Sequence, residues 1–320
     1  MLDIALSGIH HVTAICGDPQ RNIDFYTGIL GLRLVKVTVN FDDPSSYHFY
    51  YGDATGSPGT LLTFFAWPNS QTGIHAAPQA TAVAFVTSKN SVGDWKTYLE
   101  KHGVAVSDIQ VRFGQQLISF SDPDGLTIEI IEDSTPEHSK AFAESGLPET
   151  TLLYGIHSVT LTEHNDDLTL KYLSEVMGLT EIGHENGRTR MSLGDSSAGR
   201  YVDVVVDTSQ ARGRIARGNI HHVAFRTPNQ DEQLLWKERV KSYGAHVSDV
   251  MERCYFQSIY YREPGGVLFE IATDTPGMEF DQSYQKLGTA LCLPPWLEVN
   301  RTAIEQIVVP ITYPEPLSEN

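Results

Sequence analysis

The chain has 320 residues, 41% of them hydrophobic and 10% aromatic, which is enough for two domains or one large domain with a substantial core. Its 23 basic and 40 acidic residues give a net charge of -17, and without a basic cluster this argues against nucleic-acid binding. The three cysteines, Cys16, Cys254 and Cys292, lie far apart, and no signal peptide or membrane-spanning apolar run is seen, which predicts a cytoplasmic protein.

Four segments of the chain share one order of predicted elements. Each begins with a short strand rich in β-branched residues, at residues 9–15, 80–86, 155–162 and 220–226. A helical pattern follows and ends near a glycine, which supplies the left-handed cap that stops a helix. Further strands with Pro and Gly turn signals come next. The repeating unit is therefore a strand, a helix and about three strands, a βαβββ module of roughly 55–65 residues.

These four modules predict an α+β fold in which the modules pair into two domains. A single module of this size is marginal on its own, and pairing buries its open strand edges. We expect an N-terminal domain at residues 7–135 with modules one and two, and a C-terminal domain at residues 153–275 with modules three and four. A linker rich in Ser, Thr, Pro and Glu separates them at residues 136–152, and the tail at residues 276–320 fits no fifth module.

A His-His pair occurs twice in similar surroundings, as Gly-Ile-His10-His11-Val near the N-terminus and as Asn-Ile-His221-His222-Val in module four. Alternate residues of a strand face opposite sides, so His11 and His222 are expected on the inward face and their neighbours on the other. The last strand of module four adds Glu270. Two imidazoles and one carboxylate are the ligand set of a facial metal site with open coordination positions.

Matching positions across the modules restricts this site to one place. At the position of His11 and His222, modules two and three have Ala82 and Ser158. At the position of Glu270, module two has Glu129, whereas modules one and three have apolar or neutral residues, around 63–65 in module one and 204–206 in module three. Glu129 alone is too little for a metal and is interpreted as a salt-bridge partner or a remnant of duplication. A three-ligand site therefore requires modules one and four to lie side by side.

The other histidines need no functional explanation. His10 has a counterpart in module three, His157, where no metal set exists, and this indicates that the first histidine of each pair has a structural role or supports a ligand. Seven histidines have no supporting context and are expected to be solvated or packing residues: His48, His75, His102, His138, His164, His184 and His246.

The repeated module and the His, His, Glu set resemble the vicinal oxygen chelate superfamily, which includes glyoxalase I, extradiol dioxygenases and antibiotic-resistance proteins. The resemblance covers residues 7–275. It is closer to the ring-cleaving dioxygenases that open hydroquinones, because of the Gly-Ile-His-His start and the second Ile-His-His. The stretches at 47–51, 57–60 and 253–260 also look like that group.

The resemblance implies a paired βαβββ fold and a non-haem Fe(II) site, or one for Mn(II) or another divalent metal. The implied ligands are His11, His222 and Glu270. The implied partners are a small hydroquinone-type or catecholic aromatic and O2, and a homo-oligomer stays open. Such a metal would favour loss of a phenol proton beside it and pass electrons to dioxygen. The side chains expected to line the pocket, with His10 close by, are Thr13, His221, Arg253 and Tyr260.

Three of these side chains have expected chemical roles. Tyr260 would position a substrate hydroxyl or donate to a developing oxyanion. Arg253 offers a planar fork that could hold an anionic intermediate or a product carboxylate. His221 would relay a proton, although its strand phase points it away from His222.

Two other functions stay open. A glyoxalase-like isomerase or lyase would use the metal as a Lewis acid, but such enzymes need a second carboxylate, and module one has neutral residues where it would lie. A protein that sequesters a small aromatic or a drug needs no metal, so the complete ligand set argues against it.

Overall fold

Four βαβββ modules follow one another along the chain, as the sequence predicts. The computed structural model describes residues 4–133, 140–194, 199–209 and 211–318, and His138 lies outside the described residues. Module one contains β1 (Ile9–Cys16), α1 (Pro19–Ile23) continued by the π-helical turn η1 (Asp24–Ile29), β2 (Arg33–Asn40), β3 (Asp43–Gly52) and β4 (Leu61–Ala66). Module two contains β5 (Gln79–Thr87), α2 (Val92–Lys101), β6 (Gln110–Arg112), β7 (Gln115–Ser121) and β8 (Thr127–Glu132).

The second half of the chain repeats this order. Module three contains β9 (Ile156–Glu163), α3 (Asp167–Glu175), β10 (Thr180–Glu185), β11 (Arg188–Ser192) and β12 (Tyr201–Val206). Module four contains β13 (Ile220–Thr227), α4 (Gln230–Ser242), β14 (Met251–Glu252), β15 (Gln257–Arg262) and β16 (Leu268–Thr273). Short helical turns η2 (Ala143–Ser145) and η3 (Glu149–Thr151) lie between the halves, and the tail adds η4 (Met278–Phe280), η5 (Tyr284–Lys286), α5 (Pro295–Glu298) and α6 (Arg301–Ile307).

Local sequence explains where the module helices begin and end. At the start of α4, the Asn229 side chain accepts a hydrogen bond from the Glu232 backbone N–H at 3.0 Å, which satisfies one free donor of the first turn. After each module helix comes a glycine in the left-handed region, with φ between +64° and +90°, as the sequence predicts. These glycines are Gly31, Gly103, Gly178 and Gly244.

Two eight-stranded sheets combine the modules in an order that differs from the order of the chain. The first sheet runs β14-β15-β16-β13-β1-β4-β3-β2 and joins modules one and four. The second runs β10-β11-β12-β9-β5-β8-β7-β6 and joins modules two and three. The expected domains, residues 7–135 and 153–275, are the two halves of the chain in sequence order. Each sheet combines one module from the first half with one module from the second half. The physical reason is that the first strands of partner modules pair antiparallel, β1 with β13 and β5 with β9.

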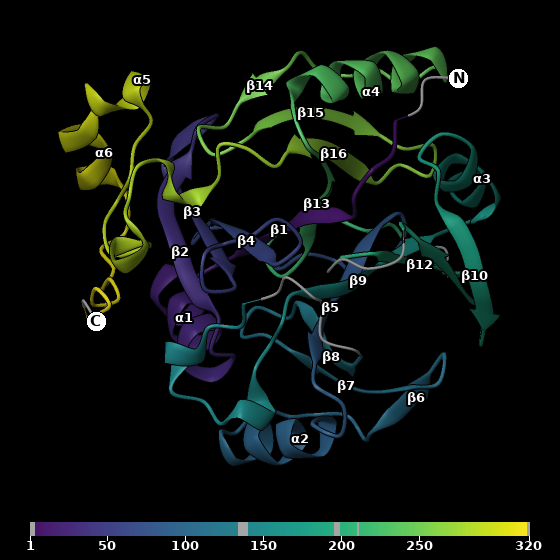
Figure 1. The fold of residues 1–320 in the computed structure, drawn as a ribbon, viewed down its shortest axis with the longest axis horizontal. Helices are drawn as coiled ribbons and strands as arrows, with labels where there is room; N and C mark the ends of the chain where they lie inside the picture. Colours follow the sequence, from purple (N-terminus) through teal and green to yellow (C-terminus); the bar gives the residue numbers. More distant parts are fainter. Residues whose placement is uncertain (1–3, 134–139, 195–198, 210, 319–320) are drawn as a thin grey trace.

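The two faces of the first sheet have different roles. Along β1, Val12 and Ala14 belong to the large apolar core, and the module helices α1–α4 lie around the outside of the strands (Figure 1). On the other face, a smaller cluster that includes Ala224 and Ala272 surrounds the polar residues of the predicted site. No helix among the described residues has the length and apolar character needed to cross a bilayer.

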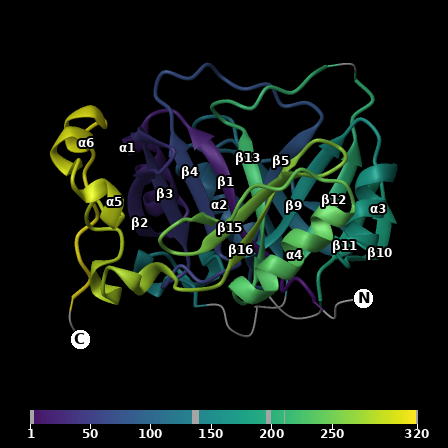
Figure 2. The same cartoon turned by 90° about the horizontal axis from the view of Figure 1, so that it is seen from above.

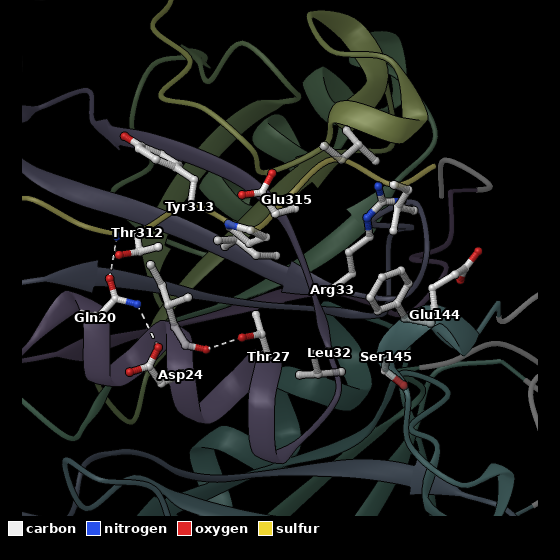
Figure 3. Close-up of a pocket in the computed structure, with 16 residues that line it drawn as sticks. Gln20, Asp24, Thr27, Leu32, Arg33, Glu144, Ser145, Thr312, Tyr313 and Glu315 are labelled. Atoms are coloured by element: carbon white, nitrogen blue, oxygen red, sulfur yellow. Dashed lines mark hydrogen bonds between the residues drawn. The ribbon is translucent and has the colours of Figure 1, made fainter. Parts of the chain in front are cut away.

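The tail packs against module one. Figures 1 and 2 show α5 and α6 beside β2 and β3. The Cys292 N–H donates to the Val37 carbonyl of β2 at 2.8 Å, and the Thr312 N–H donates to Gln20 Oε1 at 2.7 Å. A hollow of about 330 Å³ lies between the tail, α1, β2 and residues 142–145 (Figure 3).

A buried pair of carboxyl groups connects modules three and four. Glu263, in the turn between β15 and β16, accepts hydrogen bonds from the N–H groups of Gly265 and Val267 and from the Thr169 hydroxyl, each at 2.8 Å. Glu163, at the end of β9, is only 1% exposed, and its Oε1 has no hydrogen-bonding partner. Burial, followed by the charge of Glu263, raises the pKa of Glu163 to about 8. The folded protein therefore holds Glu163 protonated at neutral pH.

We expect Glu163→Gln to stabilise the protein by roughly 1–2 kcal/mol at pH 8 and by less at pH 5. In the unfolded chain this carboxyl ionises near 4.5, whereas in the folded chain it ionises near 8. Between these values the unfolded state binds fewer protons, so the contribution of Glu163 to stability falls as the pH rises. Chemical denaturation of both proteins at several pH values measures the difference. An equal pH dependence in wild type and variant would contradict this explanation.

Candidate metal centre

Three adjacent strands in the middle of the first sheet bring His11, His222 and Glu270 together. β1 and β13 pair with Thr13 opposite His222, and β13 and β16 pair with Ala224 opposite Glu270. The three side chains are at most 4% exposed. His222 Nε2 lies 2.9 Å from Glu270 Oε2, and His11 Nε2 lies 3.4 Å from the same oxygen. The two Nε2 atoms are 3.4 Å apart.

The electrostatics of these donors fit a divalent cation. Burial acts to raise the pKa of Glu270, but His11 and then His222 outweigh it and hold the pKa well below its usual range. Burial lowers the pKa of His222, which favours the neutral imidazole that a metal needs. Glu270 Oε2 is buried without a hydrogen bond of acceptable geometry. An ionised oxygen and two imidazole nitrogens thus converge on one point, all ligand atoms lying within 4.8 Å of one another.

Two further histidines orient the candidate ligands. His10 Nδ1 lies 2.8 Å from His11 Nδ1, and His221 Nδ1 lies 2.8 Å from His222 Nδ1. Burial, followed by the interaction with His11, holds the pKa of His10 well below its usual value, and burial lowers the pKa of His221 to about 3. Each neutral neighbour can therefore accept a hydrogen bond from the Nδ1–H of its ligand histidine, which leaves the Nε2 lone pair of that ligand directed at the centre.

β-Bulges explain why these neighbours do not point away as strand alternation predicts. The pairing of β1 with β13 skips His10 between Ile9 and His11, and skips His221 on the other strand. A bulge places two residues of one strand opposite a single residue of the other, which disturbs the strict alternation of side chains. The expectation that His10 and His221 face away from their neighbours is therefore wrong, whereas only one histidine of each pair reaches the centre.

Glu270 has its own positioning contacts on β15. The Ser258 hydroxyl donates to Glu270 Oε1, the carboxylate oxygen that does not face the histidines. Tyr260 is the strand partner of Glu270, and its ring lies 5.7 Å from that of His222. Burial, followed by Glu270, raises the pKa of Tyr260, so its hydroxyl stays protonated and able to donate. Arg253 Nε donates to the Tyr260 oxygen at 3.3 Å.

A small enclosed cavity lies next to these groups. Its lining includes two of the candidate ligands, His11 and His222, together with Arg253 and Tyr260. Thr13 and His221, which the resemblance places in the lining, are not among these residues. Thr13 instead bonds through its hydroxyl to that of Thr63 at 2.8 Å. The remaining lining residues are Asn40, Phe41, Asp42, His48, Tyr50, Phe65 and Phe256.

His48 is a cavity residue that the sequence analysis missed. It was expected to be solvated or to fill space, but His48 Nε2 lies 2.9 Å from the Thr63 hydroxyl and Nδ1 lies 3.0 Å from the Tyr50 hydroxyl. Burial holds the pKa of His48 well below its usual value. A signal was available in the repeat, because His48 stands two residues before Tyr50 as Ser258, which contacts Glu270, stands two residues before Tyr260.

The first sheet therefore carries two matching but unequal half-sites. Thr63 of module one lies opposite Thr13 as Glu270 of module four lies opposite Ala224. A hydroxyl thus replaces the carboxylate in module one, and no second carboxylate among the described residues joins the group of His11, His222 and Glu270. Module one therefore contributes one candidate ligand, His11, and module four contributes two.

In the second sheet, arginine side chains occupy the place that corresponds to the candidate metal centre of the first sheet. Arg112 donates to both oxygens of Glu129, at 2.6 and 2.8 Å, which confirms the interpretation of Glu129 as a salt-bridge partner. The expectation that module three has only neutral residues at the matching position is wrong, because Asp203 lies there, just before 204–206. Arg190 donates to both oxygens of Asp203, at 2.7 and 2.9 Å.

Comparison with known proteins agrees with the fold and the site. Residues 8–130 and 155–271 match the Glyoxalase/Bleomycin resistance protein/Dioxygenase superfamily. The four βαβββ modules in two sheets, with a candidate His, His, Glu centre in the first, are the architecture that this match leads one to expect. The chain belongs to the Glyoxalase/Bleomycin resistance protein/Dioxygenase superfamily.

Individual relatives match nearly the whole chain. The "Putative ring-cleaving dioxygenase MhqO" of Bacillus subtilis (strain 168) is 41% identical over 304 residues, which cover 95% of this chain and 96% of that protein. The chlorohydroquinone/hydroquinone 1,2-dioxygenase of Sphingobium indicum is 35% identical over 299 residues, covering 92% and 93%. A crystal structure of a "putative dioxygenase from Bacillus subtilis" is 40% identical, with a TM-score of 0.91 over 97% of this chain and 99% of that one.

We expect His11→Ala, His222→Ala and Glu270→Gln each to remove most bound divalent metal while the chain stays folded, because three donors share one ion. Metal analysis and circular dichroism of anaerobically prepared protein measure both properties. Glu129→Gln, the matching change in the second sheet, should retain the metal and lose about 1–3 kcal/mol of stability, because Arg112 is left without its partner. Normal metal content in any of the three ligand variants would refute the assignment.

Proposed function

We propose that this protein is a non-haem Fe(II)-dependent ring-cleaving dioxygenase that acts on hydroquinone-type aromatics and O2, with Mn(II) as the alternative metal. The observation that carries the proposal is the convergence of His11, His222 and Glu270 beside a buried aromatic cavity. The names of the relatives support the same reaction class and substrate class. Two neutral imidazoles and one carboxylate favour iron with open positions for substrate and dioxygen.

When bound, Fe(II) would supply the electrons for dioxygen and lower the pKa of a phenol beside it. The protein supplies position and shape. Phe65 and Phe256 offer apolar surfaces on which a flat ring can pack. His10 and His221 keep the Nε2 atoms of the ligands in place through their Nδ1 contacts.

Two polar side chains would stabilise the negative charge that develops on the substrate. Tyr260 keeps its proton, so its hydroxyl can donate to a substrate oxygen that becomes negative. The Arg253 guanidinium stabilises the same charge through Tyr260, to which its Nε donates. Both groups lie in a cavity with little solvent access, where such interactions are stronger than in water.

Module one argues against the isomerase alternative. A glyoxalase-like reaction needs a second carboxylate to move a proton, and the matching position is occupied by Thr63. Its hydroxyl is held by Thr13 and His48 at 2.8 and 2.9 Å. A neutral hydroxyl held in this way is a poor general base.

Oxygen uptake after anaerobic Fe(II) loading and addition of hydroquinone tests the proposed function. We expect uptake together with a new ultraviolet absorption band from the opened ring. A protein that ignores hydroquinones and catechols but turns over a thiol hemiacetal would be an isomerase instead, and the dioxygenase proposal would fail.

We expect Tyr260→Phe to retain the metal and lower kcat by about 100-fold, because the donor to the developing charge is removed. Tyr261→Phe is the matched control on the opposite face of β15, where the hydroxyl contacts Met177 Sδ at 3.7 Å, and it should retain turnover. Oxygen-electrode kinetics on both variants provide the measurement. Unchanged turnover in Tyr260→Phe would remove this residue from the mechanism.

A further inference from the structure

The cavity beside the candidate metal centre is narrow in this structure. Its volume is about 30 Å³, whereas a cavity that admits benzene is on the order of 150 Å³. A substituted aromatic ring therefore enters only when part of the wall moves. The wall outside the candidate metal centre is formed by Asn40, Phe41 and Asp42, where β2 ends and the chain turns into β3.

An ion pair joins this turn to the opposite wall. Arg253 Nη2 donates to Asp42 Oδ2 at 2.9 Å. The Asp42 side chain is 59% exposed and that of Arg253 only 13%, so the carboxylate lies at the solvent side of the guanidinium. The neighbouring Phe41 packs edge-on against Trp296 of α5, at 5.6 Å between ring centroids. The tail thus supports the turn that carries Asp42.

The pairing determines which charges an entering ligand meets. The positive charge of Arg253 is compensated by Asp42 on the outer side, while its Nε is engaged by the Tyr260 hydroxyl on the inner side. A neutral diol can replace wall contacts without opposing these charges. A ligand with a ring carboxylate must instead compete with Asp42 for the guanidinium and approach the Asp42 carboxylate, which has the same charge.

We propose that Asp42 is a specificity-determining residue that excludes aromatic ligands carrying a carboxylate by occupying the anion-binding guanidinium of Arg253. This inference rests on the proposed function for the substrate class, hydroquinones. It does not require turnover, because the selection takes place when the ligand enters. 2,5-Dihydroxybenzoate is the matched probe, since it differs from hydroquinone by one carboxylate.

Calorimetric titration under anaerobic conditions tests the inference on the full-length, metal-loaded protein. We expect Asp42→Asn to increase the affinity for 2,5-dihydroxybenzoate at least about tenfold relative to hydroquinone, because one close like charge is removed and a guanidinium is released. The gain should shrink as the salt concentration rises. Asp43→Asn removes a neighbouring charge that does not line the cavity and should leave the ratio of affinities as in wild type.

A second variant separates a specific effect from a general change of charge. The double variant Asp42→Asn, Arg253→Gln should lose the gain in affinity for 2,5-dihydroxybenzoate, because it has no guanidinium to bind the ring carboxylate. Equal affinity ratios in wild type and Asp42→Asn, or an equal gain in Asp43→Asn, would overturn the inference. Because binding is measured without oxygen, a protein that shows the selection but no ring cleavage would leave the inference standing while the proposed dioxygenase function fails.

Discussion

The antiparallel seam between β1 and β13 is the interaction on which the site depends. It brings together two strands that are more than 200 residues apart in the chain, with His11 on one and His222 on the other. β16 then pairs parallel with β13 and adds Glu270. The seam carries a bulge on each strand, and the bulges bring His10 and His221 back to their neighbours. The register between β1 and β13 therefore both brings the two histidine ligands together and places the neighbouring histidines that orient them.

The two sheets show how the same framework compensates buried negative charge in different ways. In the second sheet, Asp203 and Glu129 are paired bidentately with Arg190 and Arg112. In the first sheet, the ion-pair contacts of Glu270 among the described residues are with imidazoles. A buried carboxylate requires a nearby cation or several donors. Two arginines meet this requirement in the second sheet, and under the proposed function a divalent metal held by His11, His222 and Glu270 would meet it in the first.

The turn after β2 links the chemistry to the surface and to the tail. Asp42 and Arg253 form an ion pair at the edge of the cavity, and Phe41 packs against Trp296. A segment near the C-terminus thus contacts the wall of a site built by modules one and four. The guanidinium that supports Tyr260 inside the cavity is the one that Asp42 engages from outside. Under the two proposals, ligand access and transition-state stabilisation would therefore depend on the same side chain, Arg253.

The sequence alone determined the module repeat, the glycine helix ends and the matching of His11, His222 and Glu270, because periodicity and repetition are local properties that survive without coordinates. Only the tertiary structure decided the rest. The bulges at His10 and His221 follow from strand pairing, and strict alternation therefore predicted the wrong direction for these rings. The role of His48 depends on contacts with side chains of two strands. Packing determines which side chains are buried, which distant strands pair and how large a cavity remains. A sequence pattern reports on neighbours along the chain, so it does not predict these contacts for individual residues.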